Sequence, residues 1–190
     1  MITMIPYTTE PRADTRVTNV TMGIWLFLAS EVMFFGALFS AYALLRVGAP
    51  SWPSGREVLS LATGAANTLI LLGMTAAVWR ARARPDRTRL WLVASTGLAL
   101  VFLGFKGLEY AGEIRSGLVP SASTFLAMYF TLTGLHALHV IGGIVANIWI
   151  AAGAGRVPAP LTAGRVRAVT LYWAFVDVVW LAIFVLMYLL

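Results

Sequence analysis

Five long apolar runs, separated by short polar connections, dominate the hydrophobic and polar pattern of this chain. A membrane-spanning helix needs about 20 predominantly apolar residues, and every run reaches that length. Prolines lie in all four connections, where they end helices. The pattern predicts an all-α, polytopic membrane protein with a single transmembrane domain, a bundle of five transmembrane helices. The expected spans are residues 22–45, 58–79, 90–109, 124–150 and 168–190.

Composition agrees with this prediction. The chain has 190 residues, of which 59% are hydrophobic and 12% are charged, and its mean hydropathy is +0.82. These values lie outside the range of soluble globular domains. Residues 1–20 contain two prolines and two acidic residues and lack the basic flank and short apolar core of a signal peptide. We expect them to form a short cytoplasmic arm.

Basic residues are distributed unevenly among the connections. Five arginines lie between the second and third runs and three in the fourth connection, and the other connections hold fewer. By the positive-inside rule the second and fourth connections are cytoplasmic, so the N-terminus is expected inside and the C-terminus outside. Because the arginines collect in loops rather than on one folded face, the net charge of +6 does not indicate nucleic-acid binding.

Ionisable residues interrupt the apolar runs, among them Glu31, His136, His139 and Asp177. A charge near the bilayer centre costs about 3 kcal/mol, so these groups should face protein rather than lipid. His136 and His139 lie one turn apart, and we expect hydrogen-bonded structural histidines. Metal binding is the alternative, but it would need ligands from other helices. The two histidines of one helix face cannot provide opposed haem ligands, and a chain without cysteine has no C-x-x-C-H haem site.

The acidic residues allow two interpretations. Glu31 and Asp177 could occupy similar depths, either as a proton-accepting or gating pair or as neutral, hydrogen-bonded carboxyls that fix helix packing. Lys106 and Glu109 are three residues apart near the outer end of the third run, which favours an interfacial ion pair or a contact to lipid or a partner subunit. No nucleophile, metal or base constellation assembles. We therefore expect no catalytic residue and no metal site in this chain.

Four segments carry a family resemblance. They read GIWLFLASEVMFF at 23–35, KGLEY at 106–110, TGLHALHVIG at 133–142 and YWAFVDVVW at 172–180. In this order, on four of the five runs, they resemble subunit III of the haem-copper oxidases. The resemblance implies a five-helix form of that subunit in a bacterial-type plasma (inner) membrane, as part of a respiratory terminal oxidase of aerobic electron transport.

In that family subunit III is non-catalytic. It packs on subunit I, in a complex that includes subunit II, binds phospholipid and supports proton uptake and stable turnover, while haem and copper belong to the partner subunits. A subunit-III-like accessory protein of a nitric oxide reductase is the alternative. One departure from the family pattern is Ala174, which replaces a usual histidine. This replacement puts a polar partner for an intramembrane carboxyl in doubt, so we expect Glu31 to be largely protonated.

Overall fold

The computed structural model describes Tyr7 and residues 10–190, and every regular element among these residues is helical. Among these described residues, five helices are long and apolar enough to cross a membrane, which confirms the predicted all-α fold. The elements are α1 (Asn19–Gly48), α2 (Gly55–Val58), α3 (Leu61–Ala83), the 3₁₀ turn η1 (Pro85–Arg87), α4 (Thr88–Arg115), α5 (Thr124–Gly153), α6 (Ala159–Phe184) and the π-helical turn η2 (Val185–Leu189). Part of the expected cytoplasmic arm lies outside the described residues.

Several helices extend past the apolar runs. α6 begins at Ala159 rather than near residue 168, and α4 continues to Arg115 rather than ending near residue 109. A search for apolar residues misses these turns because arginine and glutamate are polar but good helix formers. Pro160 lies in the first turn of α6, where a proline leaves no helical hydrogen bond unmade.

Hydroxyl side chains and glycines set the helix ends. Thr18, Ser60 and Ser123 each accept a hydrogen bond from the backbone N–H three residues later, which caps α1, α3 and α5. Gly117 follows α4 and Gly155 follows α5, both with positive φ, a backbone conformation that glycine adopts without strain. The connections are therefore specified locally.

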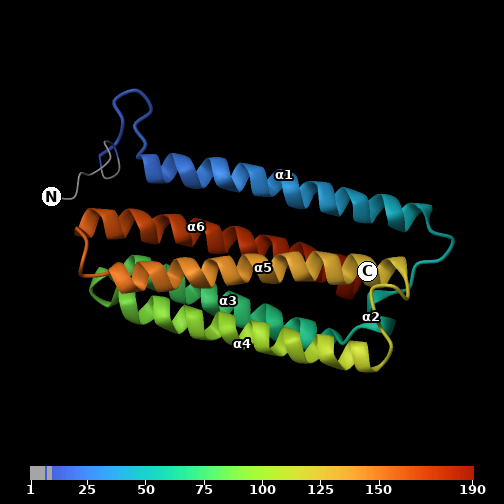
Figure 1. Ribbon diagram of the computed structural model, residues 1–190. Helices are drawn as coiled ribbons and strands as arrows, with labels where there is room; N and C mark the ends of the chain where they lie inside the picture. Colours follow the sequence, from blue (N-terminus) through green and yellow to red (C-terminus); the bar gives the residue numbers. More distant parts are fainter. Residues whose placement is uncertain (1–6, 8–9) are drawn as a thin grey trace.

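Helices α3 to α6 form an antiparallel bundle, and α1 lies along its side (Figure 1). α1 packs against α6 and α5. The interior of the bundle is filled by large side chains, among them Met74, Phe102, Val140, Trp173 and Trp180. The start of α1 and the C-terminus lie at opposite ends of the molecule (Figure 1).

A narrow seam attaches α1 to the bundle. Leu28, Phe35 and Tyr42 are its buried residues, and they are spaced by seven. This is the spacing of residues on one face of a helix that packs along a neighbour. Most other large side chains of α1 are exposed, Met33 at 76% for example. In a membrane protein such an apolar face is available to lipid or to another subunit.

The end of α1 also holds the C-terminal turn. The Tyr42 hydroxyl donates to the Leu186 carbonyl at 2.8 Å, and Arg46 donates to the Tyr42 hydroxyl at 2.9 Å. Gly55 of α2 lies directly against the backbone of Met187, where a Cβ would overlap the carbonyl. Contacts from two sides therefore fix η2 in place.

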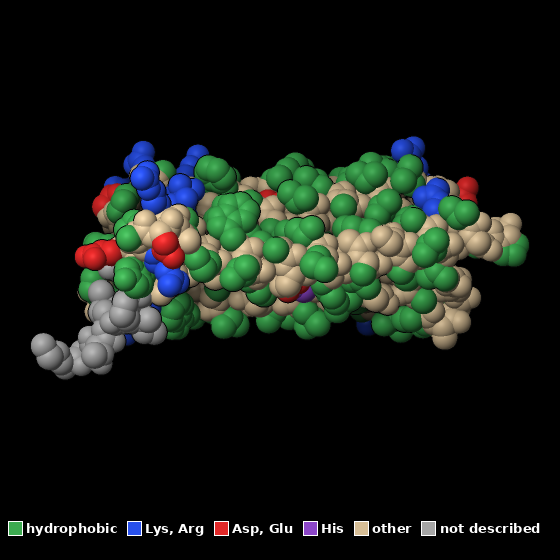
Figure 2. All heavy atoms as spheres, turned by 90° about the horizontal axis from the view of Figure 1, so that it is seen from above, with side chains coloured by type: hydrophobic (Ala, Val, Ile, Leu, Met, Phe, Trp, Pro, Cys, Tyr) green, Lys and Arg blue, Asp and Glu red, His purple; other side chains and the backbone are tan. Residues whose placement is uncertain are grey.

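Charged side chains gather at the two ends of the molecule, and the surface between them is mainly hydrophobic (Figure 2). The larger group of arginines lies at the end that carries the start of α1, together with the α3–α4 and α5–α6 connections. This distribution is typical of an integral membrane protein. That the arginine-rich end is cytoplasmic stays a prediction.

Candidate functional site

A polar link joins α1 to the bundle near the middle of both helices. His139 Nε2 of α5 lies 2.9 Å from Glu31 Oε2 of α1. Both side chains are 17% exposed. The partner of Glu31 thus comes from α5, and Ala174 does not leave this carboxyl without a hydrogen bond.

The hydrogen bonds of His139 determine how many protons this link holds. Its Nδ1 lies 2.8 Å from the Leu135 carbonyl, which can only accept, so Nδ1 carries a hydrogen. A hydrogen bond between Nε2 and Glu31 then requires one further proton, either on the ring or on the carboxyl. The link therefore holds one proton between its two residues, as an ion pair or as a neutral acid and base.

Aromatic residues enclose the link. The Phe35 ring meets the His139 ring edge-on, with the centroids 5.0 Å apart, and Phe34 lies 6.3 Å away. The Tyr172 hydroxyl of α6 donates to the His139 carbonyl at 2.7 Å. Low-dielectric surroundings of this kind strengthen a hydrogen bond and make an unpaired polar group costly.

His136 has a different environment, although it is one turn from His139. It is fully buried between Phe102, with ring centroids 5.7 Å apart, and Trp180, at 5.1 Å. Neither ring nitrogen has a hydrogen-bond partner among the described residues. The described residues provide no partner for the hydrogen-bonded histidine expected here, because the neighbouring helices present aromatic rings at this level of the bundle.

Asp177 does not pair with Glu31. Its carboxyl lies toward Thr75 of α3, whereas Glu31 faces α5. Asp177 is 7% exposed, and its Oδ1 forms no hydrogen bond within the described part of the chain. α6 begins earlier than the apolar run suggested, so Asp177 also lies farther along its helix than expected.

Lys106 and Glu109 form the ion pair that their spacing predicts, with Nζ 3.0 Å from Oε2. The structure places this pair inside the bundle rather than at its surface, with exposed fractions of 3% and 6%. The Lys106 ammonium also donates to the hydroxyls of Tyr129, at 2.8 Å, and Tyr188, at 2.7 Å. Glu113 accepts a hydrogen bond from Tyr129 at 2.9 Å. We call these five residues the lysine cluster.

Sequence reasoning missed three members of the lysine cluster. Glu113 lay beyond the expected end of its run, yet it is four residues after Glu109 and so on the same helix face. Tyr129 and Tyr188 were counted only as apolar positions. Pairing across helices was not predictable from spacing, because Tyr188 lies near the C-terminus, far along the sequence from the other members of the cluster.

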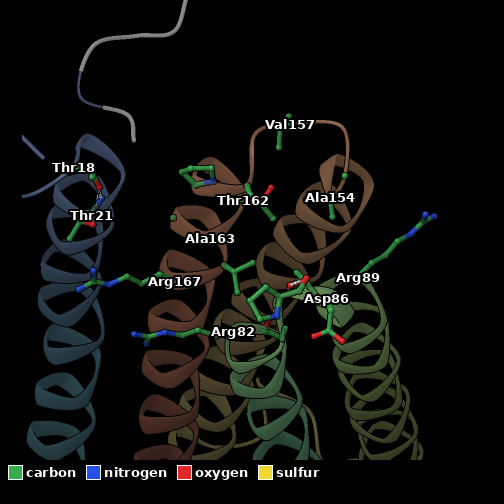
Figure 3. Close-up of a pocket in the computed structure, with 18 residues that line it drawn as sticks. Thr18, Thr21, Arg82, Asp86, Arg89, Ala154, Val157, Thr162, Ala163 and Arg167 are labelled. Carbon is green, nitrogen blue, oxygen red and sulfur yellow. Dashed lines mark hydrogen bonds between the residues drawn. The ribbon is translucent and has the colours of Figure 1, made fainter. Parts of the chain in front are cut away.

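A basic pocket of about 720 Å³ lies at the arginine-rich end. It is formed by the start of α1, the α3–α4 connection and the α5–α6 connection, and three arginines line it: Arg82, Arg89 and Arg167. Arg82 and Arg167 extend in the same direction, toward α1, and Arg89 points to the other side (Figure 3). The first two could contact one anionic group between α1 and α6.

An apolar slot of about 530 Å³ separates α1 from α5 and α6 near the same end. Phe27, Ala146 and Tyr172 are among its lining residues. Arg165 also lines the slot, with its guanidinium 4.0 Å from the centre of the Trp149 ring. An apolar cavity with a cation at its edge is complementary to a lipid, whose acyl chain is apolar and whose phosphate is anionic.

No group of three or more His, Asp or Glu side chains in the described part of the chain comes together as a metal site. The two histidines face different neighbours, and the sequence contains no cysteine. That this chain holds neither metal nor haem stays a prediction.

Comparison with known proteins matches residues 12–190 to the model of the family described as cytochrome c oxidase subunit III. The chain belongs to this family. The resemblance seen in the four sequence segments is confirmed, and these segments hold Glu31, both histidines, the Lys106–Glu109 pair and Asp177. The link and the lysine cluster are therefore features of a subunit III chain.

Individual relatives extend over most of this subunit III chain. It is 31% identical over 185 residues to cytochrome bo(3) ubiquinol oxidase subunit 3 of Pseudomonas aeruginosa, covering 90% of this chain and 85% of the relative. It is 34% identical over 182 residues to the probable cytochrome c oxidase subunit 3 of Mycobacterium leprae, covering 91% of this chain and 89% of the relative. It is 34% identical over 185 residues to the heme-copper oxidase subunit I+III of Aeropyrum pernix, covering 90% of this chain and 23% of that longer protein.

Proposed function

We propose that this chain is the non-catalytic subunit III of a respiratory terminal oxidase, where it packs on subunit I beside subunit II. The haem and copper centres belong to those partners. The observation that carries this proposal is the Aeropyrum pernix relative, whose name joins subunits I and III in one protein. Two subunits that occur fused in a relative are expected to lie side by side when they are separate chains.

The subunit binds phospholipid through two features. The apolar slot beside α1 accommodates an acyl chain, and Arg165 at its edge is available to the headgroup. In the basic pocket, Arg82 and Arg167 offer two guanidinium groups to one phosphate. Guanidinium is well suited to phosphate because its planar fork can donate two parallel hydrogen bonds.

The subunit supports proton uptake and stable turnover by holding α1 and its lipid in place. The Glu31–His139 link fixes α1 halfway along its length, and the Tyr42 and Arg46 hydrogen bonds fix its end. Loss of the Glu31–His139 link, which lies one turn beyond the slot-lining Phe27, would open the slot and release its lipid. In a bacterial-type inner membrane, the arginine-rich end faces the cytoplasm.

Deleting the chain tests this role. The remaining oxidase is expected to keep its haem spectrum and its initial rate but to lose activity progressively during turnover. The complete complex, which contains this chain, serves as the control and is assayed in the same detergent and lipid. An altered haem spectrum on deletion would contradict a non-catalytic role. Equal activity loss with and without the chain would contradict a role in stable turnover.

Phosphorus analysis of the purified complex tests the lipid proposal. The double change Arg82→Gln and Arg167→Gln should lower the amount of tightly bound phospholipid, while Arg56→Gln at the opposite end should not. Equal phospholipid in all three proteins would contradict the assignment of the basic pocket.

An accessory role in a nitric oxide reductase is the alternative. The relatives named above are all oxidase subunits, so no observation favours it. Oxygen consumption by the purified complex, compared with nitric oxide consumption, separates the two functions.

A further inference from the structure

The lysine cluster contains more acidic than basic groups. Lys106 is its one cation, and two carboxyls face it, those of Glu109 and Glu113. All three side chains are buried, at 3%, 6% and 9% exposed. With every group ionised the cluster would keep one buried negative charge without a partner, which is costly in low-dielectric surroundings.

Hydrogen bonds assign the charges of the ion pair. The Lys106 ammonium has three hydrogens, and all three have acceptors, at Glu109, Tyr129 and Tyr188. Glu109 accepts from Lys106 through Oε2 and from Tyr188 through Oε1 at 2.7 Å. Lys106 and Glu109 thus form a fully hydrogen-bonded cation and anion. Glu113 is the carboxyl in excess.

Glu113 has few partners of its own. Its Oε1 lies 2.9 Å from the Tyr129 hydroxyl, and its Oε2 is buried with no partner among the described residues. The same hydroxyl lies 3.2 Å from Glu109 Oε1. Tyr129 therefore stands between the two carboxyls and within hydrogen-bond distance of both.

We propose that the lysine cluster is a proton-binding site, in which Glu109 and Glu113 share one proton through the hydroxyl of Tyr129. With the proton on Glu113, its O–H donates to the Tyr129 oxygen, and the Tyr129 O–H donates to Glu109. Passing the proton moves the Glu113 hydrogen to Tyr129 and the Tyr129 hydrogen to Glu109. Tyr129 ends neutral, the proton has changed carboxyls, and no electron is transferred.

The surroundings allow few competing charges. The titratable groups that face the cluster are Lys106 and Tyr110 on its own helix, Tyr129 on α5, Tyr188 on η2, and His136 farther along α5. The ionisable residues of α3, Arg80 and Arg82, lie at its far end. Glu113 is two residues from the end of α4, so the site lies close to the aqueous phase at the end that carries the C-terminus.

Infrared difference spectroscopy of the intact oxidase complex tests the proposal, because a protonated carboxyl has a carbonyl band separate from that of a carboxylate. The wild-type-minus-Glu113→Gln spectrum should show one such band near neutral pH, shifted in D₂O. Glu57→Gln, at an exposed position of α2, is the matched control and should remove no band. An assembled Glu113→Gln complex that lacks no band would overturn the proposal.

A second variant keeps the test decisive if Glu113→Gln fails to assemble. Tyr129→Phe keeps the ring and removes only the shared hydroxyl. The carbonyl band of the protonated carboxyl should then move, because that carboxyl loses its hydrogen-bond partner, while the haem spectrum stays unchanged. A carbonyl region identical to that of the wild type would show that Tyr129 connects no protonated carboxyl, and the proposal would be wrong.

Discussion

His139 Nε2 and Glu31 Oε2 lie 2.9 Å apart and form a side-chain hydrogen bond between α1 and the bundle, halfway along both helices. Elsewhere along its seam α1 is held by the apolar contacts of Leu28 and Phe35, and at its end by Tyr42. The link therefore gives a loosely packed helix a fixed register and rotation against α5.

The first prediction concerns this link. Glu31→Ala or His139→Ala should each weaken attachment of α1 by about 1–3 kcal/mol, because each leaves a partly buried polar group without its partner. The double variant should lose little more than either single variant, since both remove the same interaction. Retention of the subunit during purification, with the thermal midpoint of its release, provides the measurement.

Glu31→Gln is the control for this prediction. Its amide can donate to Nε2 of a histidine whose Nδ1 carries the hydrogen, so most of the attachment should remain. If glutamine were as damaging as alanine, the link would depend on a full negative charge rather than on a hydrogen bond.

The second prediction concerns His136, whose ring is buried without a hydrogen-bond partner among the described residues. His136→Phe should keep assembly near the wild-type level, because no hydrogen bond is lost and a ring still contacts Phe102 and Trp180. His136→Ala should destabilise by about 2–4 kcal/mol through the cavity it leaves. Thermal unfolding of the complex measures both. Equal damage by both variants would indicate that the imidazole nitrogens are needed.

The third prediction concerns the contact between α5 and α6 at Gly143. A Cβ added there would overlap the Trp173 ring. Gly143→Ala should therefore cost about 1–3 kcal/mol, as overpacked cores do. Gly104→Ala on α4 is the control, because no atom of the described residues other than its own helix backbone and chain neighbours lies within 4 Å of the added Cβ. It should be neutral or stabilising by up to about 1 kcal/mol. Subunit yield and thermal midpoint distinguish the two.

The fourth prediction concerns the C-terminal turn. Tyr42→Phe removes the hydrogen bond to the Leu186 carbonyl and one of the two acceptors of Arg46, the other being the Leu190 carbonyl. We expect a loss of about 1 kcal/mol and faster hydrogen exchange in η2. Because η2 carries Tyr188, the lysine cluster should also become more accessible. Unchanged exchange at residues 185–189 would show that other contacts suffice.

The fold could be predicted from the sequence because its main signal is the length of apolar runs. The polar residues were identifiable for the same reason, since Glu31, His136, His139 and Asp177 interrupt these runs. Their partners were not. A helix spacing relates residues of one helix, so it predicted Lys106 with Glu109 but could not pair Glu31 with His139.

Two differences between the predicted and the observed surroundings of these residues have a clear physical origin. His136 and His139 are three residues apart, yet the position of α1 places one histidine in the aromatic interior and the other at a polar contact. The arginines near the start of α6 are polar, so the apolar run did not include the first two turns of this helix. The predicted position of Asp177 along its helix was therefore wrong. Both errors arise because tertiary packing, rather than local sequence, decides what a side chain faces.

Co-purification tests the central claim, that this chain functions as subunit III of a haem-bearing oxidase. The chain would carry an affinity tag in the intact organism, and its solubilised complex would be analysed by subunit mass and optical spectrum. We predict one copy of this chain per copy of a haem-containing catalytic subunit, with oxygen reduction by the complex. Isolation of the chain without a haem-containing partner, from membranes that contain active oxidase, would contradict the account.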